Sequence, residues 1–540
     1  MHEHSPDHSC LTAQVGRAEP SRGSALRARW FCALLATALL NGCATQRFES
    51  APSPEPAFAL AAQPSDRLAP VEAAITAQHG AGASGFELLD SNEDGLRWRL
   101  ALVDSAQRSI DLQYYLWYAD SSGLLLTKRL LDAADRGVRI RLLVDDITAL
   151  LRDATTVKLR DHGAALLDSH PNIELRLFNP WSRRGLASRA GEAATDMKRL
   201  NQRMHHKVLI ADNRAAIIGG RNIGDEYFGL NEDFNFHDLD VIGIGPIARE
   251  ASAVFDAFWN SEWVLPASAL AVEPTPEAAA EARSALLAGL RGRPPLQRFD
   301  LEPQDWSAEF EELSGRLHAG SGEMLTDVPA AGEIAHEMLA SIYQLLLGAR
   351  REVLIINAYI IPGDTAIETL RRLTADGVTI RILTNSLASH DVPAVNSHYK
   401  QSRRALLEAG VQLFEMRPDA AIQSTVSDTP PVRAKFMGLH SKAMVIDRAR
   451  AYIGSMNFDP RSAAINTEMG VVVEGPGLAG ELATLIERDM QSENSWQVVL
   501  NDSGKLRWVA GDEVLTRQPA RSWWQRVQDV FFMMFPKELY

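Results

Sequence analysis

The stretch His205-His206-Lys207-Val208-Leu209-Ile210-Ala211-Asp212 returns later in the chain as His440-Ser441-Lys442-Ala443-Met444-Val445-Ile446-Asp447. Each copy is followed by a glycine and an asparagine, in Gly219-Gly220-Arg221-Asn222 and in Gly454-Ser455-Met456-Asn457. The shared residues all recur 235 positions later in the chain. Five fixed identities, each at a background frequency of a few per cent, match by chance about once in 10⁷ positions. The chain therefore carries a duplicated site.

The residue types in the repeat suit a phosphodiester. A histidine can act as nucleophile or proton carrier, a lysine offers a positive charge to a phosphate, and an asparagine amide donates hydrogen bonds. Side chains alternate between the faces of a strand, so the histidine and lysine of each copy point the same way. Asp212 and Asp447 have the opposite parity. They belong to the candidate site by motif, but we expect them to point away from the phosphate and to brace the strand end.

Two acidic residues are candidates to orient the histidines. An imidazole that acts as nucleophile needs an acceptor on its other nitrogen, which fixes its tautomer. The segments 236–241 and 466–471 align with Asp238 over Glu468. We therefore predict that Asp238 and Glu468 hold the imidazole rings, with Asp240 as the alternative to Asp238.

The doubled motif HxKxxxxD followed by GxxN resembles the signature of the phospholipase D superfamily. Four further stretches are similar to its bacterial cardiolipin synthase C branch, namely residues 111–115, 219–225, 236–240 and 466–468. The resemblance spans roughly residues 66 to 540. It implies an α/β fold with two similar phospholipase D-like α-β-α domains, each with a mixed, largely parallel sheet. A pseudo-twofold axis would relate the domains, and one site would form between them.

The resemblance also implies a mechanism. A covalent intermediate splits displacement at phosphorus into two easier steps. His205 would attack phosphorus, while His440 would protonate the leaving glycerol oxygen and then deprotonate the incoming alcohol; the sequence itself is symmetric on this choice. The charge that grows on the phosphoryl oxygens would be held by Lys207, Lys442, Asn222 and Asn457. With two ammonium groups we expect neither a metal nor another cofactor to be needed.

Hydrolysis and transesterification share these residues and differ in the second nucleophile. The first hypothesis is a phosphatidyltransferase that makes cardiolipin from membrane phospholipids, with phosphatidylglycerol as acceptor and phosphatidylglycerol or phosphatidylethanolamine as donor. The second is a phospholipase D that forms phosphatidic acid with water. A secreted nuclease is disfavoured, and no nucleic-acid partner is expected, because the net charge is −14 and nucleic-acid binders carry a basic footprint. With both motifs in one chain, we expect activity as a monomer.

The front of the chain predicts export and lipidation. Arginines precede the apolar run 30–40, which is too short to span a bilayer and is typical of a signal peptide. It ends in Leu40-Asn41-Gly42-Cys43, which is similar to the lipobox of bacterial lipoproteins. We predict a signal peptide over residues 1–43 and a lipid on Cys43. The protein would then be membrane-associated in the bacterial cell envelope, anchored on the periplasmic side; an uncleaved anchor is the alternative.

The chain as a whole is 46% hydrophobic and 23% charged, a composition typical of a globular protein with two sizeable cores. We expect a Pro-rich tether at 44–65, domains at 66–265 and 321–500 with a linker at 266–320 between them, and a tail at 501–540. In each half a strand, a helix, a glycine and a second strand follow one another, which is typical of a βαβ unit. Their ranges are 110–116, 124–136, Gly137 and 138–144, then 353–361, 366–375, Gly377 and 378–384.

The tail predicts an amphipathic helix that begins near Arg521 and ends at Pro536. Spacing gathers seven apolar residues on one face: Trp523, Trp524, Val527, Val530, Phe531, Met534 and Phe535. A short helix with tryptophan at its front is typical of a membrane surface. The alternative is a terminal helix packed on the second domain.

The roles of several residues near the motifs are left open, and that of His206 is assigned by parity. His206 lies between His205 and Lys207 and is predicted to face away from the site. Tyr114 and Tyr115 could belong to the core or to the pocket lining. A lipid headgroup could be contacted by the segment that contains His390, His398, Tyr399, Arg403 and Arg404.

Overall fold

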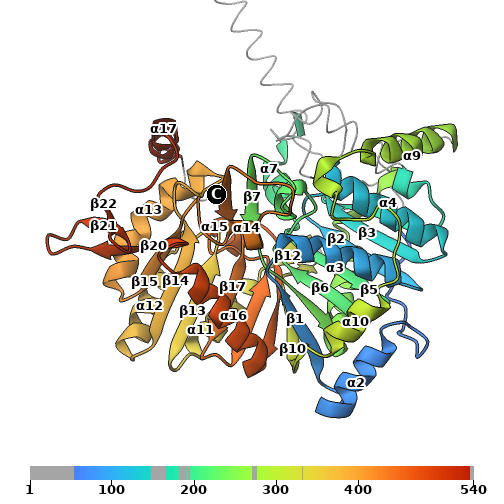
Figure 1. Ribbon diagram of the computed structural model, residues 1–540, viewed down its shortest axis with the longest axis horizontal. Coiled ribbons are helices and arrows are strands. Elements are labelled where there is room, and N and C mark those ends of the chain that lie inside the picture. The colour runs from blue at the N-terminus through green and yellow to red at the C-terminus, as the bar shows by residue number, and fades with distance from the viewer. Residues whose placement is uncertain are drawn as a thin grey trace, which may run out of the picture.

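The computed structural model describes residues 54–146, 166–181, 191–192, 195–269, 276–330 and 332–535. They form two halves, with the N-terminal half on the right and the C-terminal half on the left of Figure 1. The predicted signal peptide, Cys43 and residues 44–53 of the predicted tether lie outside the described residues.

The first half is built on a mixed sheet. Its strands lie in the order β8 (Asp240–Ile244), β6 (Ala215–Gly219), β5 (Lys207–Ala211), β2 (Ser109–Tyr114), β3 (Arg139–Asp145), β4 (Ile173–Phe178) and β9 (Val264–Pro266). Strands β2, β3 and β4 pair in parallel, as the predicted βαβ unit requires. The other neighbours in this order are antiparallel.

The second half repeats this order with its own strands. They are β19 (Met469–Glu474), β18 (Arg450–Gly454), β17 (Lys442–Ile446), β13 (Glu352–Asn357), β14 (Thr379–Asn385), β15 (Gln412–Met416) and β20 (Ser495–Leu500). Beyond β20 the sheet continues with β21 (Leu506–Ala510) and β22 (Glu513–Leu515). The matching order and pairing confirm two similar halves.

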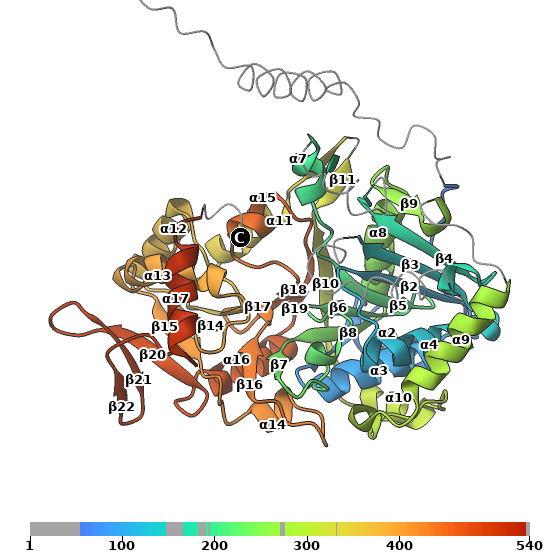
Figure 2. The same ribbon diagram turned by 90° about the horizontal axis from the view of Figure 1, so that it is seen from above.

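Two further strands join the halves into one sheet. Strand β1 (Ser84–Leu89) pairs with β8, and β10 (His318–Thr326) pairs with β19. Strands β1 and β10 pair with each other, in the middle of the molecule where the halves meet (Figure 1). Figure 2 shows β10 at this junction from above. The sheet is therefore mixed as predicted. It is not largely parallel, because parallel pairing within it is confined to β2-β3-β4 and β13-β14-β15 while the hairpins and the junction are antiparallel.

Helices cover both faces of each half. Those of the first half are α2 (Ala69–His79), α3 (Asn92–Ser105), α4 (Ser121–Asp135), α7 (Met197–Asn201), α8 (Pro246–Trp259), α9 (Pro276–Leu290) and α10 (Ser307–Ser314). Those of the second half are α11 (Met338–Leu347), α12 (Asp364–Ala375), α13 (Pro393–Glu408), α14 (Gln423–Val426), α15 (Pro460–Ala464), α16 (Pro476–Asp489) and α17 (Trp523–Phe532). None of the helices in this part of the chain is long and apolar enough to span a bilayer.

The apolar core explains why the halves stay together. Helices α3 and α4 pack on the outer face of the first sheet and α11 to α13 on the outer face of the second. Helices α8 and α16 share one buried cluster that includes Phe86, Val208 and Val445, so this cluster crosses from one half into the other. Burying such a continuous apolar surface favours the joined arrangement over two separate domains.

Local sequence sets the ends of these elements. Helix α4 begins after Asp120, whose carboxylate accepts the Gly123 N–H. Gly137 and Gly377 follow α4 and α12 with φ of 93° and 89°, a conformation that glycine adopts at little cost. The two predicted strand-helix-glycine-strand units are thereby confirmed.

Two segments expected to be connections pack on the first half instead. Residues 54–65, which we call the N-terminal strap, lie along it: Arg141 donates to the Ala57 carbonyl (2.7 Å) and Asn260 accepts the Ala57 N–H (2.9 Å). The expected linker, 266–320, contains α9 and α10, and Leu286, Leu290 and Phe310 join the first core. The prolines and alanines made both segments resemble connections, although each segment packs against residues elsewhere in the chain.

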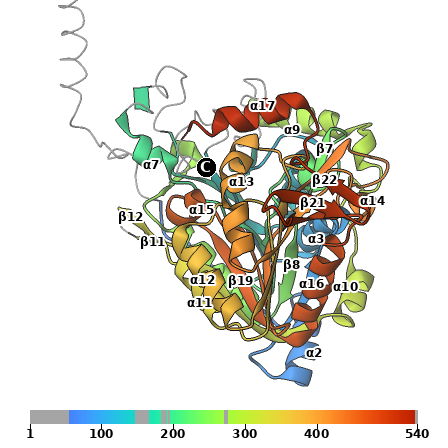
Figure 3. The same ribbon diagram turned by 90° about the vertical axis from the view of Figure 1, so that its left-hand side faces the viewer.

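The tail forms the predicted helix, α17, as the outermost element above α13 (Figure 3). The remaining short strands are β7 (Phe234–His237), β11 (Val328–Ala330), β12 (Glu333–Ala335) and β16 (Phe436–Leu439). Of these, β7 and β16 pair in parallel with each other and tie the halves together beside the duplicated motif.

Candidate active site

Backbone contacts bring the two motifs together. His205 lies just before β5, and its N–H donates to the Thr467 carbonyl of the second half at 2.9 Å. His440 lies between β16 and β17, and its N–H donates to the His237 carbonyl of the first half at 2.8 Å. Both histidines are therefore fixed at the junction of the halves.

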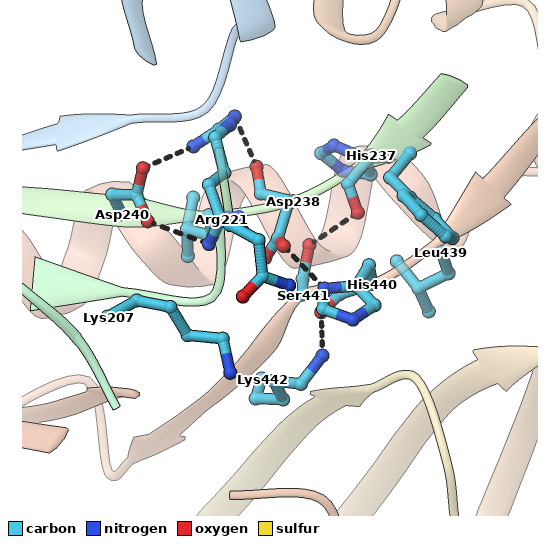
Figure 4. A network of polar contacts seen from close by, with 12 residues as sticks. Lys207, Arg221, His237, Asp238, Asp240, Leu439, His440, Ser441 and Lys442 are labelled. Atoms are coloured by element: carbon cyan, nitrogen blue, oxygen red, sulfur yellow. Dashed lines mark hydrogen bonds and ion pairs between the residues drawn. The ribbon is translucent and has the colours of Figure 1, made fainter. Parts of the chain in front are cut away.

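Each histidine ring is bonded to a carboxylate from the opposite half. His205 Nδ1 lies 2.9 Å from Glu468 Oε2. His440 Nδ1 lies 2.6 Å from Asp238 Oδ2, a contact that Figure 4 shows. All four side chains are buried. The alignment identified the two carboxylates, but it gave no sign that they are exchanged between the halves.

The alternative carboxylate, Asp240, forms ion pairs with two buried guanidinium groups. Its Oδ2 lies 2.9 Å from Arg99 Nη1 and 3.1 Å from Arg221 Nη1. Arg221 also donates to the Asp238 carbonyl (Figure 4), so Asp240 and Arg221 support the strand segment that carries Asp238.

The two lysines approach each other beside His440 (Figure 4). Lys207 Nζ donates to the His205 carbonyl at 2.6 Å, and Lys442 Nζ donates to the His440 carbonyl. Asn222 and Asn457 are buried in the same region, and Asn222 Oδ1 accepts the Leu116 N–H at 3.2 Å. Two cations can thus face one anion between the halves.

Burial controls protonation in the site. It lowers the pKa of His205 well below its usual value, and the positive charges of Lys207 and Lys442 lower it further. Burial also lowers the pKa of Lys207 and brings that of Lys442 to about 8. It raises the pKa of Glu468 to about 8. A neutral His205 imidazole at pH 7 is the state that a nucleophile requires.

Aromatic rings wall the site on both sides. Tyr115 meets the His205 ring edge-on at 5.0 Å, and Tyr227 meets the His440 ring at 5.2 Å. Phe236 lies 4.9 Å from the same His440 ring. Tyr114 is instead a core residue whose hydroxyl accepts from Arg99. Sequence analysis missed Tyr227 and Phe236; the aromatic residues that follow the first GxxN were the available signal.

The motif aspartates lie at the far ends of their strands. Asp212 accepts the N–H groups of Gln107, Arg108 and Ser109 at 2.8–2.9 Å, where β2 begins. Asp447 accepts those of residues 350–352 at 2.7–2.9 Å, where β13 begins. Both have positive φ, 50° and 54°. They fix β5 to β2 and β17 to β13, as parity indicated, and do not join the group of histidines and lysines.

Residues whose roles were open are now placed. His206 faces away, with Nδ1 3.0 Å from Gln113 Nε2 and its ring 4.3 Å from that of Phe258. Tyr399 and Arg403 both bond the buried Glu415, at 2.9 and 2.6 Å, so these two side chains do not make the possible headgroup contact.

His390, from the same segment, lies closer to the site. It stacks on Tyr359 at 5.3 Å, and Tyr359 donates its hydroxyl hydrogen to Asp391. Burial would raise the pKa of Asp391, but the hydrogen bond and charge of His390 and the charge of His440 hold it below its usual value.

Comparison with known proteins agrees with this geometry. A family model described as cardiolipin synthase, PLD-like domain, matches residues 100–259 and 342–490. The chain is 36% identical to cardiolipin synthase C of Escherichia coli (strain K12) over 485 residues, 87% of this chain and 99% of that one. It is 24% identical to cardiolipin synthase B of Salmonella typhi over 452 residues, 83% of this chain and 87% of that one.

A solved structure shares the fold. Phosphatidylserine synthase of Haemophilus influenzae Rd KW20 superposes with a TM-score of 0.51 at 15% identity, over 76% of this chain and 87% of that one. The duplicated sheet and the paired motifs thus define a phospholipase D-like protein. Within that class, the chain belongs to the cardiolipin synthase family.

Replacement of the motif aspartates should separate stability from chemistry. Asp212→Ala leaves three backbone N–H groups without their acceptor, so we expect the free energy of unfolding to fall by about 3 kcal/mol while kcat of the folded protein stays near wild type. Asp212→Asn keeps an acceptor and tolerates positive φ, and should recover part of the loss. Asp447→Ala should cost less, because two of its partners, Arg350 and Arg351, are exposed. Denaturant unfolding and kcat together measure this; a collapse of kcat at unchanged stability would place Asp212 in the chemistry.

The alkaline limit of activity should depend on Lys442. Its ammonium group is lost as the pH rises through a pKa of about 8, so kcat/KM should fall above that pH. Arginine stays charged at any accessible pH. Lys442→Arg should therefore shift the alkaline limb upward even if the maximal rate falls. An alkaline limb that stays in place in an active Lys442→Arg enzyme would assign it to another group.

Proposed function

We propose that the protein is a phosphatidyltransferase that makes cardiolipin by transesterification of membrane phospholipids through a phosphohistidine on His205. The observation that supports this most is the pair of crossed histidine-carboxylate contacts with two lysines beside them. Membership of the cardiolipin synthase family supports the same reaction. Phosphatidylglycerol would be the acceptor, and phosphatidylglycerol or phosphatidylethanolamine the donor.

In the first step the His205 Nε2 lone pair attacks the donor phosphorus. Nδ1 is engaged by Glu468, which leaves Nε2 as the free nitrogen. The P–O bond to the donor headgroup breaks, and His440 gives its proton to the leaving oxygen. Asp238 holds His440 through Nδ1 and so directs its Nε2 at that oxygen.

In the second step His440 takes the proton of the acceptor hydroxyl. The acceptor oxygen attacks phosphorus, the P–N bond breaks, and His205 is restored. Lys207 and Lys442 stabilise the charge on the phosphoryl oxygens in both steps, with Asn222 and Asn457 as further donors. The reaction exchanges one phosphodiester for another, so it needs no nucleotide, and we propose that it needs no metal.

The front of the chain supports a location in the cell envelope. We propose a lipid on Cys43 that anchors the enzyme on the periplasmic side, and activity as a monomer, since both motifs come from one chain. A reaction without nucleotide suits that compartment. Water in place of the acceptor would turn the same site into a phospholipase D.

His205 and His440 should differ on trapping although both are needed for turnover. His205→Ala and His440→Ala should each abolish activity, because nucleophile and acid act as a unit. Donor lipid labelled in its phosphate should leave label on the wild-type protein and on His440→Ala, and none on His205→Ala. Label retained on His205→Ala would contradict the assignment of the nucleophile.

The second nucleophile should decide the product. Glycerol or another primary alcohol, added to the wild-type enzyme with donor vesicles, should divert product to the matching phosphatidyl-alcohol, because the intermediate partitions between acceptors. Lipid analysis by mass spectrometry measures the ratio, with His205→Ala as the blank. Phosphatidic acid as the persistent product at high acceptor concentration would favour the hydrolase.

A further inference from the structure

Helix α17 is amphipathic, but its polar side faces the protein and its apolar side faces outward. The polar Gln525 and Asp529 are buried, at 5% and 1% exposure, whereas Trp523 and Trp524 are 73% and 55% exposed. Eight of the thirteen exposed large hydrophobic side chains in the described part of the chain lie within residues 523–535. Such a concentration of exposed apolar surface marks a binding surface. We call it the α17 apolar face: Trp523, Trp524, Val527, Val530, Phe531 and Met534.

Polar contacts fix the helix without using this face. The Asp529 carboxylate accepts from Asn396 and Lys400 of α13, both at 2.6 Å, and from Gln518 at 2.8 Å. Gln525 donates to the Leu387 carbonyl. Charge-assisted hydrogen bonds in a buried setting are strong, so α17 is held firmly with its apolar side outward.

The segment just before α17 also contacts elements beside the active site. Arg521 donates to the carbonyls of Ala388 (2.7 Å) and His390 (3.3 Å) and lies 3.5 Å over the ring of Phe436. Phe436 begins β16, the strand that leads directly to His440. The end of β14 is also bonded to that strand, since the side chain of Asn385 bonds the backbone of Leu439 through both its amide oxygen and its amide nitrogen.

We propose that the α17 apolar face lies in the surface of a phospholipid bilayer and holds the active site against it. The proposal rests on the proposed function in that the substrate is itself a membrane phospholipid. Gln525 of α17 and the preceding Arg521 contact the loop after β14, and Arg521 also lies over Phe436 of β16. Insertion of this face would therefore set the distance and orientation of the site relative to the lipid headgroups.

Composition and size favour a bilayer over a protein partner. Two neighbouring tryptophans, with ring centres 5.7 Å apart, stand at the front of the face, where the bilayer interface favours amphipathic rings. A ten-residue helix is about 15 Å long, too short to supply the roughly 800 Å² per partner of a stable dimer. The net charge of −14 disfavours adsorption by charge to anionic lipids, so apolar contact must supply the affinity.

Tryptophan fluorescence can test insertion without turnover. The other tryptophans in the described part of the chain are buried or half-buried, so bromine on lipid acyl chains should quench Trp523 and Trp524 selectively. The full-length enzyme in phosphatidylcholine-phosphatidylglycerol vesicles should be quenched by brominated lipid. The double variant Trp523→Tyr/Trp524→Tyr should lose most of that quenching. Equal quenching of both proteins overturns the proposal, whether or not the enzyme makes cardiolipin.

Turnover should depend on the face only when the substrate is in a bilayer. Trp523→Gln/Trp524→Gln should lower turnover on vesicles roughly tenfold and leave turnover in detergent-lipid mixed micelles unchanged. Leu347→Gln and Val514→Gln remove exposed apolar side chains elsewhere and should change neither rate. An equal loss in vesicles and micelles would make α17 part of the fold rather than a docking surface. Light scattering that shows a dimer in the wild type and a monomer in the tryptophan variant, with unchanged vesicle turnover, would assign the face to a second copy and overturn the proposal.

Discussion

The crossed histidine-carboxylate contacts are the constraint on which the rest of the structure depends. Neither half holds its own imidazole, because Glu468 serves His205 and Asp238 serves His440. A buried carboxylate or imidazole without its partner is costly, so the halves must stay in register to within a hydrogen bond. The parallel pairing of β7 with β16, and the apolar cluster shared by α8 and α16, supply that register. Duplication alone gives two motifs; the exchange makes them one site.

The two half-sites are not equivalent, although their motifs are. Ser455 donates its hydroxyl hydrogen to Glu468, whereas a side chain at the matching Gly220 would come within 2.2 Å of Asp238. Burial raises the pKa of Glu468 to about 8, while His440, Lys442 and Arg221 outweigh burial and hold that of Asp238 below its usual value. Asp238 is therefore the more readily ionised of the two carboxyl groups, and its negative charge stabilises a proton on His440 better than Glu468 does on His205. This difference supports His440 as proton carrier and His205 as nucleophile, a choice on which the sequence was symmetric.

Sequence analysis succeeded where the determinants are local. A strand, a helix and a glycine of positive φ follow one another in the chain, and parity alone predicted that Asp212, Asp447 and His206 face away from the site. It failed where partners lie far apart in the chain. The strap looked like a tether because its bonds run to Arg141 and Asn260, and the antiparallel share of the sheet depends on strands that meet only after folding. The exchange of Glu468 and Asp238 is invisible for the same reason: an alignment of two halves says which residues correspond, not which half each one serves.

For the amphipathic tail, the sequence predicted the helix but not what each of its faces contacts. Periodicity identified the apolar face of α17 and favoured a membrane helix, with a helix packed on the second domain as the alternative. In the structure the polar face packs on α13 and the apolar face is left outward. That arrangement would complement the lipid anchor that we propose on Cys43. A single acyl chain binds a membrane only marginally, so such an anchor would supply proximity but no orientation. A second contact, fixed to the strand that leads to His440, would supply the orientation that in-line attack on a headgroup phosphate needs.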